Sequence, residues 1–348
     1  MIELDGSVGE GGGQVLRTAL SLSMLSGEKF RVCGVRAKRV NPGLQAQHLA
    51  AVSAAASVCG ARVEGAVLRS QELFFEPGRV RGGEYFFDVG TAGSAMLVLQ
   101  TVLPALLFAR ESSRVVVRGG TWAKFAPPHL FFERVFLKCL SFMGVSARFS
   151  VEKWGWFPAG GGVACLEVVP VARVKPFRVL ERGPLAGLSC VAAASLLPSH
   201  VTRRMKVASS KFFLENGFRA SVEELRPPAD CAGAGFFVEA DYESCVAGFD
   251  CVGEKGVPAE EVALKACRDF LEFHSSNAAC DAHLADQLLP YCALASGESI
   301  FTTAAISSHL RTNAEVIARF LPAVTRLSEG LPCTVSVQGA AFKPREEK

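Results

Sequence analysis

The sequence predicts an α/β protein, in which a large domain of repeated α/β units carries a smaller inserted α/β module. The first observation is a recurring order of strand, glycine-rich turn and apolar helix. It runs through residues 2–25, returns at 85–108 and is echoed more faintly at 115–143. A period of about 80 residues is typical of repeated supersecondary units. The second observation is a change of pattern near residues 181–184, after which residues 186–275 show a strand, a helix, three strands and a helix.

Length and composition fit this division. The chain has 348 residues, 49% of them hydrophobic and 20% charged, which is enough for one large core or several smaller ones. We expect a large domain of residues 1–184 and 276–340, an inserted domain of residues 185–275 and a flexible tail of residues 341–348. The net charge of +3 argues neither for nor against nucleic acid, so a basic site has to come from local clustering.

No part of the sequence predicts a membrane anchor or a secreted protein. The longest apolar run, residues 92–109, contains Gln100 and Pro104 and is short for a bilayer span, so we expect a buried helix there. The twelve cysteines are scattered, without a CxxC pair or a Cys/His spacing suited to zinc, and no secretory signal is predicted ahead of Asp5. We therefore expect reduced, mostly buried cysteines and a cytoplasmic location.

The N-terminal unit begins with a strand over residues 2–5, a glycine-rich turn over residues 6–14 and a helix over residues 15–25. Such a turn presents backbone N–H groups to a phosphate, although its spacing is neither that of a P-loop nor that of a dinucleotide site, and an ordinary tight turn is the alternative. Glu10 lies in the turn and Arg17 about one turn into the helix. A carboxylate beside a phosphate favours a divalent metal between them, because like charges otherwise repel.

A strand over residues 30–35 leads to the densest cationic segment, and a helix of small residues follows over residues 49–59. The segment contains Arg36, Lys38 and Arg39, with Gln47 and His48 as neutral hydrogen-bonding groups. A solvated charged surface is the alternative. The place of the segment between a strand and a helix, where ligand sites gather, favours phosphate binding by the arginines.

Further strands are expected at residues 62–65, 73–78, from 85 onward and at 115–117, with helices after the turn at 90–94 and over 131–142. Gln100 is a polar residue in an otherwise apolar helix, and it needs a partner, which a ligand could supply. After the inserted module, residues 281–290 return to a helix with polar residues, and a strand over 299–304 precedes the segment 306–313.

His309 lies where this last strand passes into an amphipathic helix. Serines precede it and Arg311 follows two residues later. A histidine near a helix start is more often a cap or a surface residue than a catalytic one. A neutral imidazole is nevertheless a competent nucleophile at neutral pH, so His309 is the candidate catalytic residue.

Together these motifs resemble the RNA 3′-terminal phosphate cyclase family. The resemblance extends from Asp5 to about Pro322 and depends on the order and spacing of motifs that are weak one by one. The motifs are residues 10–14 with Arg17, 36–48, 90–94, 158–162, 253–256, 285–287 and His309.

The resemblance implies the ATP-dependent conversion of an RNA 3′-phosphate into a 2′,3′-cyclic phosphodiester. It implies a large domain of repeated βαβαββ-type units, like that of carboxyvinyl-transferring enzymes, with a small inserted domain. A histidine matching His309 is expected to take AMP from ATP, with release of pyrophosphate, and to pass it to the RNA 3′-phosphate. The 2′-hydroxyl then closes the ring and releases AMP. The implied ligands are ATP, RNA 3′-phosphate ends and a divalent metal, Mg²⁺ or Mn²⁺, while the sequence leaves monomer and homodimer open.

The resemblance also implies a role for each residue that matches a family motif. Glu10 is expected to hold the metal. The residues expected to hold the RNA or nucleotide phosphates are Arg17, Arg36, Arg39, Gln47 and His48. The residues expected to frame the adenosine are Gln100, Pro127, His283, Leu284, Ala285, Asp286 and Gln287. Two places depart from the family pattern, because His283 stands where a tyrosine is expected, and the loop from Trp122 to His129 is unusual where a smaller or acidic one is expected.

Two other classes of function were weighed. A non-enzymatic RNA-binding relative would lack the nucleophile, and the presence of His309 with Glu10 and the arginines argues against it. A small-molecule transferase of the same architecture would need no histidine nucleophile, and a shared fold does not settle function. Since no site residue falls in the inserted module, the sequence predicts that the module can be shortened without abolishing self-adenylylation.

Overall fold

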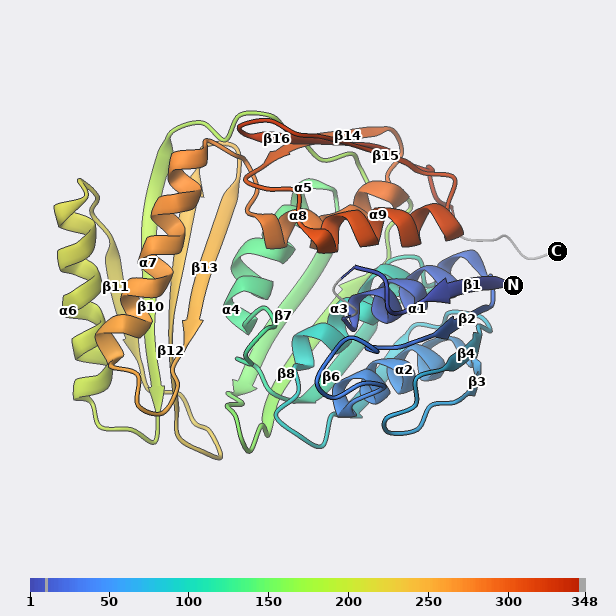
Figure 1. Cartoon of the computed structure of the whole chain (residues 1–348), viewed down its shortest axis with the longest axis horizontal. Coiled ribbons are helices and arrows are strands. Elements are labelled where there is room, and N and C mark those ends of the chain that lie inside the picture. Colours follow the sequence, from blue (N-terminus) through green and yellow to red (C-terminus); the bar gives the residue numbers. More distant parts are fainter. Residues whose placement is uncertain (10–11, 344–348) are drawn as a thin grey trace.

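The first unit of the large domain is a four-stranded sheet with two helices. The computed structural model describes residues 1–9 and 12–343 (Figure 1). The elements of this unit are β1 (Ile2–Asp5), α1 (Gln14–Ser26), β2 (Phe30–Cys33), α2 (Ala46–Cys59), β3 (Arg62–Glu64) and β4 (Leu73–Glu76). The sheet has the order β1-β2-β4-β3, with β1 and β2 parallel and the other pairs antiparallel.

The second unit repeats this arrangement. Its elements are β5 (Gly83–Asp88), α3 (Ala95–Leu106), β6 (Ser113–Gly119), a helical segment made of α4 (His129–Phe131), η1 (Phe132–Leu137) and α5 (Lys138–Phe142), then β7 (Ser146–Lys153) and β8 (Gly162–Val169). The sheet order is β5-β6-β8-β7, again with the first pair parallel. The faint echo at residues 115–143 is therefore the second half of this unit and not a unit of its own.

The third unit has the same topology but is interrupted. Its elements are β9 (Arg178–Val179), α8 (Ala282–Leu294), β14 (Glu298–Thr303), α9 (Ser308–Phe320), β15 (Val324–Ser328) and β16 (Cys333–Gln338). Read from β9, the sheet order is β9-β14-β16-β15, with β9 and β14 parallel. All three units thus share the βαβαββ order and the same strand arrangement, which confirms the predicted α/β fold of repeated units.

The inserted segment follows β9 and has the elements in the predicted order. They are β10 (Leu185–Ser195), α6 (His200–Glu215), β11 (Ser221–Leu225), β12 (Gly233–Tyr242), β13 (Val246–Val252) and α7 (Ala259–Ser276). The sheet order is β11-β10-β12-β13. Its helices α6 and α7 cover one face, at the left of Figure 1, where they enclose a separate hydrophobic cluster. On the other face, Val191, Phe237 and Val246 belong to the main core of the large domain.

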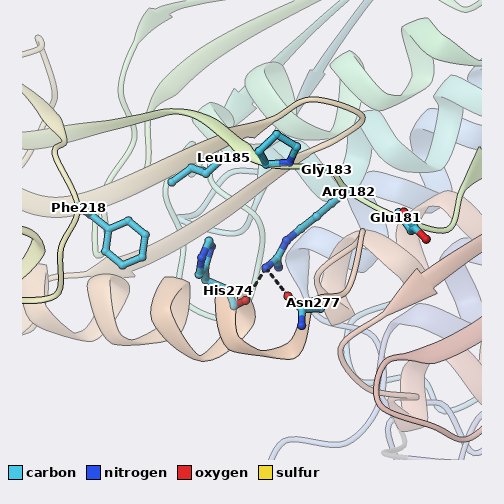
Figure 2. A pocket seen from close by; sticks show the side chains of 8 residues that line it. Glu181, Arg182, Gly183, Leu185, Phe218, His274 and Asn277 are labelled. Carbon is cyan, nitrogen blue, oxygen red and sulfur yellow. Dashed lines mark hydrogen bonds between the residues drawn. The ribbon is translucent and has the colours of Figure 1, made fainter.

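Arg182 joins the two chain segments that connect this module to the large domain. Its guanidinium donates to the carbonyl oxygen of His274 and to Oδ1 of Asn277, at 2.5 and 3.1 Å (Figure 2). It also donates to the carbonyl oxygens of Phe273 and Ala278, at 3.2 and 3.4 Å. A cation at the C-terminal carbonyls of α7 is favoured by the helix dipole. Arg182 also borders a cavity of about 490 Å³. Because its side chain is already hydrogen-bonded to the protein, we assign Arg182 a structural role.

The helices of the large domain pack against one another. Helix α1 contacts α2, α3 and α9, and α8 contacts α9. Ten consecutive or nearly consecutive residues of α1 are buried, from Val15 to Leu25, so this helix is apolar on nearly all sides, as a central helix must be. The predicted apolar helix before Ala109 is likewise buried in this core.

Several boundaries differ from the sequence-based prediction. Helix α2 begins at Ala46 and not at Leu49, because Gln45 and His48 form a reciprocal capping arrangement ahead of the first turn. The C-terminal segment is anchored beyond residue 341, since Ala341 and Phe342 donate to the carbonyls of Ala295 and Leu294 and Phe342 packs edge-on against Phe108. These two residues belong to the segment 341–348, for which a flexible tail is expected. Residues 344–348 lie outside the described part of the chain.

Candidate functional site

His309 lies beside the glycine-rich turn of the first unit. An alanine β-carbon at Gly12 would lie 3.7 Å from Cε1 of His309 and 3.5 Å from Nη2 of Arg39. One turn further along α9, Thr312 lies against Gly9. The fold therefore brings the candidate nucleophile, from the last unit, to the turn and the cationic segment of the first unit.

The helix α9 places His309 at its N-terminal end. Ser307 is the N-cap and its side chain accepts a hydrogen bond from the backbone N–H of Leu310 at 3.0 Å. His309 is the second helical residue and is half-buried. Because a helix N-terminus stabilises negative charge, its position suits a group that reacts with a phosphate.

The same turn also packs against His48 and Arg17. An alanine β-carbon at Gly13 would overlap Nε2 of His48 and would lie 2.8 Å from Nη1 of Arg17. Only glycine leaves room for both side chains at this place. The backbone of the turn thus approaches two of the residues expected to hold a phosphate.

Burial lowers the pKa values of three basic side chains around this turn, and neighbouring charges shift them as well. Burial lowers the pKa of Arg17 to about 10, with the Asp286 carboxylate acting in the opposite direction. Burial and then Arg39 lower the pKa of Arg36. Burial, and after it the charges of Arg17 and Arg36, lower the pKa of His48 to about 3. Arg17 and Arg36 make protonation of His48 less favourable, and Arg39 has the same effect on Arg36, so the surroundings of the turn have a positive potential, which would suit a polyanion.

His48 enters this site as a neutral group. Its Nδ1 accepts a hydrogen bond from the backbone N–H of Gln45 at 3.1 Å, so the ring proton of the neutral form is on Nε2, which faces Gly13. A pKa of about 3 keeps the ring neutral at physiological pH. His48 can therefore donate one hydrogen bond to a phosphate oxygen but brings no charge.

Gln47 connects the first unit to the second. Its Oε1 accepts a hydrogen bond from the backbone N–H of Ser94 at 3.1 Å. Directly after β6, the backbone N–H of Gly120 donates to the carbonyl of Gly93 at 2.8 Å. These contacts place the turn at residues 90–94 between the cationic segment and the loop that carries Pro127.

The start of α8 lies between α1, α3 and α9. Asp281 is its N-cap and accepts from the backbone N–H groups of His283 and Leu284, both at 2.9 Å. Nε2 of Gln14 donates to Oδ1 of Asp286 at 3.3 Å. The segment expected to frame the adenosine is therefore tied directly to the helix that carries Arg17.

Gln100 has a protein partner. Its Nε2 donates to Oε1 of Gln287 at 2.6 Å, so the prediction that it needs a partner is met by another residue of the same expected adenosine frame. His283 is exposed, whereas Leu284 and Ala285 are fully buried in the main core. The side chains of Leu284 and Ala285 thus serve packing, and we retain His283, Gln100 and Gln287 as the polar members of the frame.

The loop around Pro127 is bulky because it is anchored by aromatic side chains. Trp122 is buried and stacks on Trp156 with ring centroids 5.3 Å apart. His129 is buried edge-on against Trp154 at 4.2 Å, and burial lowers the pKa of His129 to about 4. The departure from the family pattern at this loop therefore has a packing explanation, and Pro127 lies half-buried between the two anchors.

A buried chain of hydrogen bonds, for which the sequence predicts no role, lies behind the site. Oγ1 of Thr18 donates to Oδ1 of Asn313 at 2.6 Å, and Nδ2 of Asn313 donates to the carbonyl of Asp286 at 2.9 Å. These bonds fix α1, α8 and α9 relative to one another. The available signal was the position of Asn313 among the apolar residues that form the buried face of α9.

The predicted metal ligand Glu10 lies outside the described residues. Among residues 1–9 and 12–343 no group of three His, Cys, Asp or Glu side chains is arranged to hold a metal ion.

Within those same ranges no helix is both long and apolar enough to span a membrane. All twelve cysteines are free thiols, and most are buried.

The chain was compared with known proteins. A model of the family described as RNA 3′-terminal phosphate cyclase matches residues 8–327. A protein of Nostoc punctiforme with that name is 45% identical over 94% of this chain and 97% of its own length. Proteins with the same name from Methylococcus capsulatus and Salmonella agona are 45% and 46% identical, over 92% and 94% of this chain and 91% and 94% of theirs.

A solved structure of the enolpyruvyl transferase NikO from Streptomyces tendae is 13% identical to this chain. The match has a TM-score of 0.27 and covers 98% of this chain and 82% of that protein. Such a likeness carries no weight for fold or function. The family-model match and the full-length relatives are decisive. The chain belongs to the RNA 3′-terminal phosphate cyclase family.

Proposed function

We propose that this protein is an RNA 3′-terminal phosphate cyclase that uses ATP and a covalent histidine–AMP intermediate. Family membership supports the overall reaction. The observation that carries the mechanism is the place of His309, beside Gly12 and Arg39 and close to the cationic groups around Gly13. A nucleophile next to a positive site suits attack on a phosphate ester.

The first step transfers AMP to the protein. A ring nitrogen of His309 attacks the α-phosphorus of ATP, so that an N–P bond forms and the bond to the bridging oxygen breaks. Pyrophosphate leaves with the electron pair, and the ring gives up its N–H proton to solvent. Arg17 compensates the charge that builds up on the phosphate oxygens.

The second and third steps take place on the RNA. An oxygen of the RNA 3′-phosphate attacks the phosphorus of the histidine-bound AMP, which breaks the N–P bond and forms an anhydride. The 2′-hydroxyl then attacks the 3′-phosphorus, loses its proton and expels AMP. Ring closure is intramolecular, so proximity contributes about 7–11 kcal/mol to lowering the barrier. In these steps Arg36, Arg39, Gln47 and His48 hold the terminal phosphate in place.

The binding sites for ATP and metal follow from the same assignment. Gln100 and Pro127, with the segment from His283 to Gln287, frame the adenosine, and the positive potential around Gly13 suits the triphosphate. Glu10 is the residue we assign to a divalent metal, Mg²⁺ or Mn²⁺, whose remaining ligands would be phosphate oxygens and water. When bound, the metal neutralises phosphate charge.

Incubation with α-³²P-labelled ATP and a 3′-phosphorylated oligoribonucleotide tests this proposal. We expect radiolabel on the wild-type protein and cyclic RNA ends, and loss of both in His309→Ala. His200→Ala is a matched control, because His200 is an exposed histidine at the start of α6 in the inserted module. RNA binding without labelling of the wild-type protein would instead identify a non-enzymatic RNA-binding protein.

A further inference from the structure

A proline inside α8 changes the hydrogen bonding of that helix. Pro290 has no backbone N–H, so it cannot donate the usual helix bond to the carbonyl of Asp286, four residues earlier. Nδ2 of Asn313, on α9, donates to this carbonyl at 2.9 Å. Asn313 is only 3% exposed, so the bond is shielded from water. An asparagine of α9 thus supplies a hydrogen bond that the backbone of α8 cannot make.

The amide of Asn313 is bound on its other side by α1. Its Oδ1 accepts a hydrogen bond from Oγ1 of Thr18 at 2.6 Å, and both residues are buried. Thr18 directly follows Arg17, and Asp286 belongs to the segment assigned to the adenosine frame. One side chain therefore ties α9 to the two helices that carry residues assigned to ATP.

His309 lies one helical turn before Asn313 on α9, and residues four apart lie on the same side of a helix. The apolar residues that α9 buries are Leu310, Val316, Ile317 and Phe320. Apolar packing is non-directional, whereas a hydrogen bond depends on both distance and angle. The two bonds of Asn313 therefore fix the rotation of α9 about its axis, and with it the place of His309 beside Gly12.

We propose that Asn313 is a positioning residue for self-adenylylation, which holds the ring of His309 in line with the α-phosphate of bound ATP. This inference rests on the proposed function, because it takes His309 as the nucleophile and α8 as part of the adenosine frame. Displacement at phosphorus requires the attacking and leaving atoms to be roughly in line, and a shift of about 1 Å can cost about 100-fold in rate. Asn313 acts through His309, so its loss should slow AMP transfer and leave ATP binding unchanged.

Single-turnover labelling with α-³²P-labelled ATP, at a series of ATP concentrations, separates the rate constant from the half-saturating concentration. In Asn313→Ala the rate constant should fall about tenfold or more, while the half-saturating concentration changes by less than about twofold. Thr18→Val, which removes the donor to Oδ1, should lower the rate constant by a smaller factor, and Thr18→Ser should restore it. The matched control is Thr202→Val in the inserted module, where a buried threonine donates to Oε2 of Glu224 at 2.9 Å. It should label as the wild type does.

The Pro290→Ala background separates positioning from stability. Alanine at residue 290 supplies a backbone N–H to the carbonyl of Asp286 from within α8, so it should raise the melting temperature of Asn313→Ala. It does not tie α9 to α8, so the slow labelling should persist in the double variant. A wild-type rate constant in Asn313→Ala, a half-saturating concentration that rises as much as the rate falls, or recovery of the rate together with the melting temperature would each overturn the inference. A wild-type protein that takes no label would overturn the proposed function as well.

Discussion

At the scale of single residues, the site combines charged arginines with a histidine that is kept neutral. Arg17, Arg36 and Arg39 are close enough to disfavour one another's charge or that of His48. This arrangement is costly in the folded protein and is relieved when an anion binds. Groups with such shifted pKa values are usual at functional sites, which is consistent with the proposed phosphate site.

The arginines of the cationic segment should contribute more to the use of the RNA 3′-phosphate than to self-adenylylation. We expect Arg36→Ala or Arg39→Ala to lower kcat/KM for a 3′-phosphorylated oligoribonucleotide about tenfold or more, because a charge-assisted phosphate contact is lost. Self-adenylylation in the absence of RNA should fall less. Parallel assays of protein labelling and cyclic-end formation measure the two effects. If labelling fails first, these arginines bind ATP and the division of roles is wrong.

His48 should make the protein sensitive to acid. Its pKa is about 3 in the folded protein and near 6.5 in the unfolded chain, so below pH 6.5 the unfolded state binds the additional proton. Stability from this group is fully present above pH 6.5 and falls as the pH drops toward 3. Between pH 6.5 and 5 the loss is about 2 kcal/mol.

Urea unfolding at pH 7 and pH 5 checks this expectation. His48→Gln should show a smaller decrease in the free energy of unfolding between the two pH values than the wild type. His129, whose pKa burial lowers to about 4, contributes in the same direction and accounts for the part that remains in the variant. Equal pH dependence in both proteins would contradict a buried neutral His48.

At the scale of elements, each side of the site comes from a turn that precedes a helix. The turn before α1 lies between His48 on α2 and His309 on α9. The turn before α3 is bound by Gln47, and Asp281 caps α8. Because βαβαββ units place these turns at corresponding positions, three repeats supply three sides of one site.

Gly13→Ala tests the close approach of the first turn. Gly13 has φ −77°, so alanine adds no backbone strain, and the only conflict is with the side chains of His48 and Arg17. We expect self-adenylylation to fall about tenfold or more, because a small displacement of the turn misaligns the reacting groups. Gly187→Ala is a suitable control, since its β-carbon would meet only Cβ of Asp241 at 3.9 Å. Similar activities in both variants would show that the turn tolerates displacement.

At the scale of the whole molecule, the inserted module and the second unit share a core. The sheet of the module faces the helical segment at residues 129–142, and a β-carbon at Gly248 would lie 2.7 Å from Cγ2 of Val135 and 3.0 Å from Cδ2 of Phe131. Glu239 and Asp241 of β12 form ion pairs with Arg134 and Lys138 of that segment. Such close packing makes the two parts interdependent.

We therefore expect the module to unfold together with the large domain. Trp122, Trp154 and Trp156, the only tryptophans of the sequence, pack against one another beside the module, so their fluorescence reports on this interface. The fluorescence and circular-dichroism transitions in urea should coincide. Gly248→Ala should shift both by the same amount, at a cost of about 1–3 kcal/mol from overpacking. A fluorescence transition that precedes loss of secondary structure would show that the module detaches first.

The sequence by itself determined the repeated α/β organisation, the order of elements in the inserted module and the family. These depend on local signals, namely hydrophobic periodicity, glycine turns and the linear spacing of motifs, which are all present in the chain before it folds. It also indicated His309 and the arginines as candidates, because their chemistry is evident from residue type and neighbours.

Only the tertiary structure decided how these groups are held. The neutral state of His48 depends on burial and on the charges of Arg17 and Arg36. The pairing of Gln100 with Gln287 and the Trp122–Asp250 contact each join residues that lie far apart in the sequence. Burial and the charges of neighbouring side chains set these properties, and both depend on packing between segments far apart in the sequence. For the same reason the sequence assigned no site residue to the inserted module, although folding places Asp250 next to the Pro127 loop.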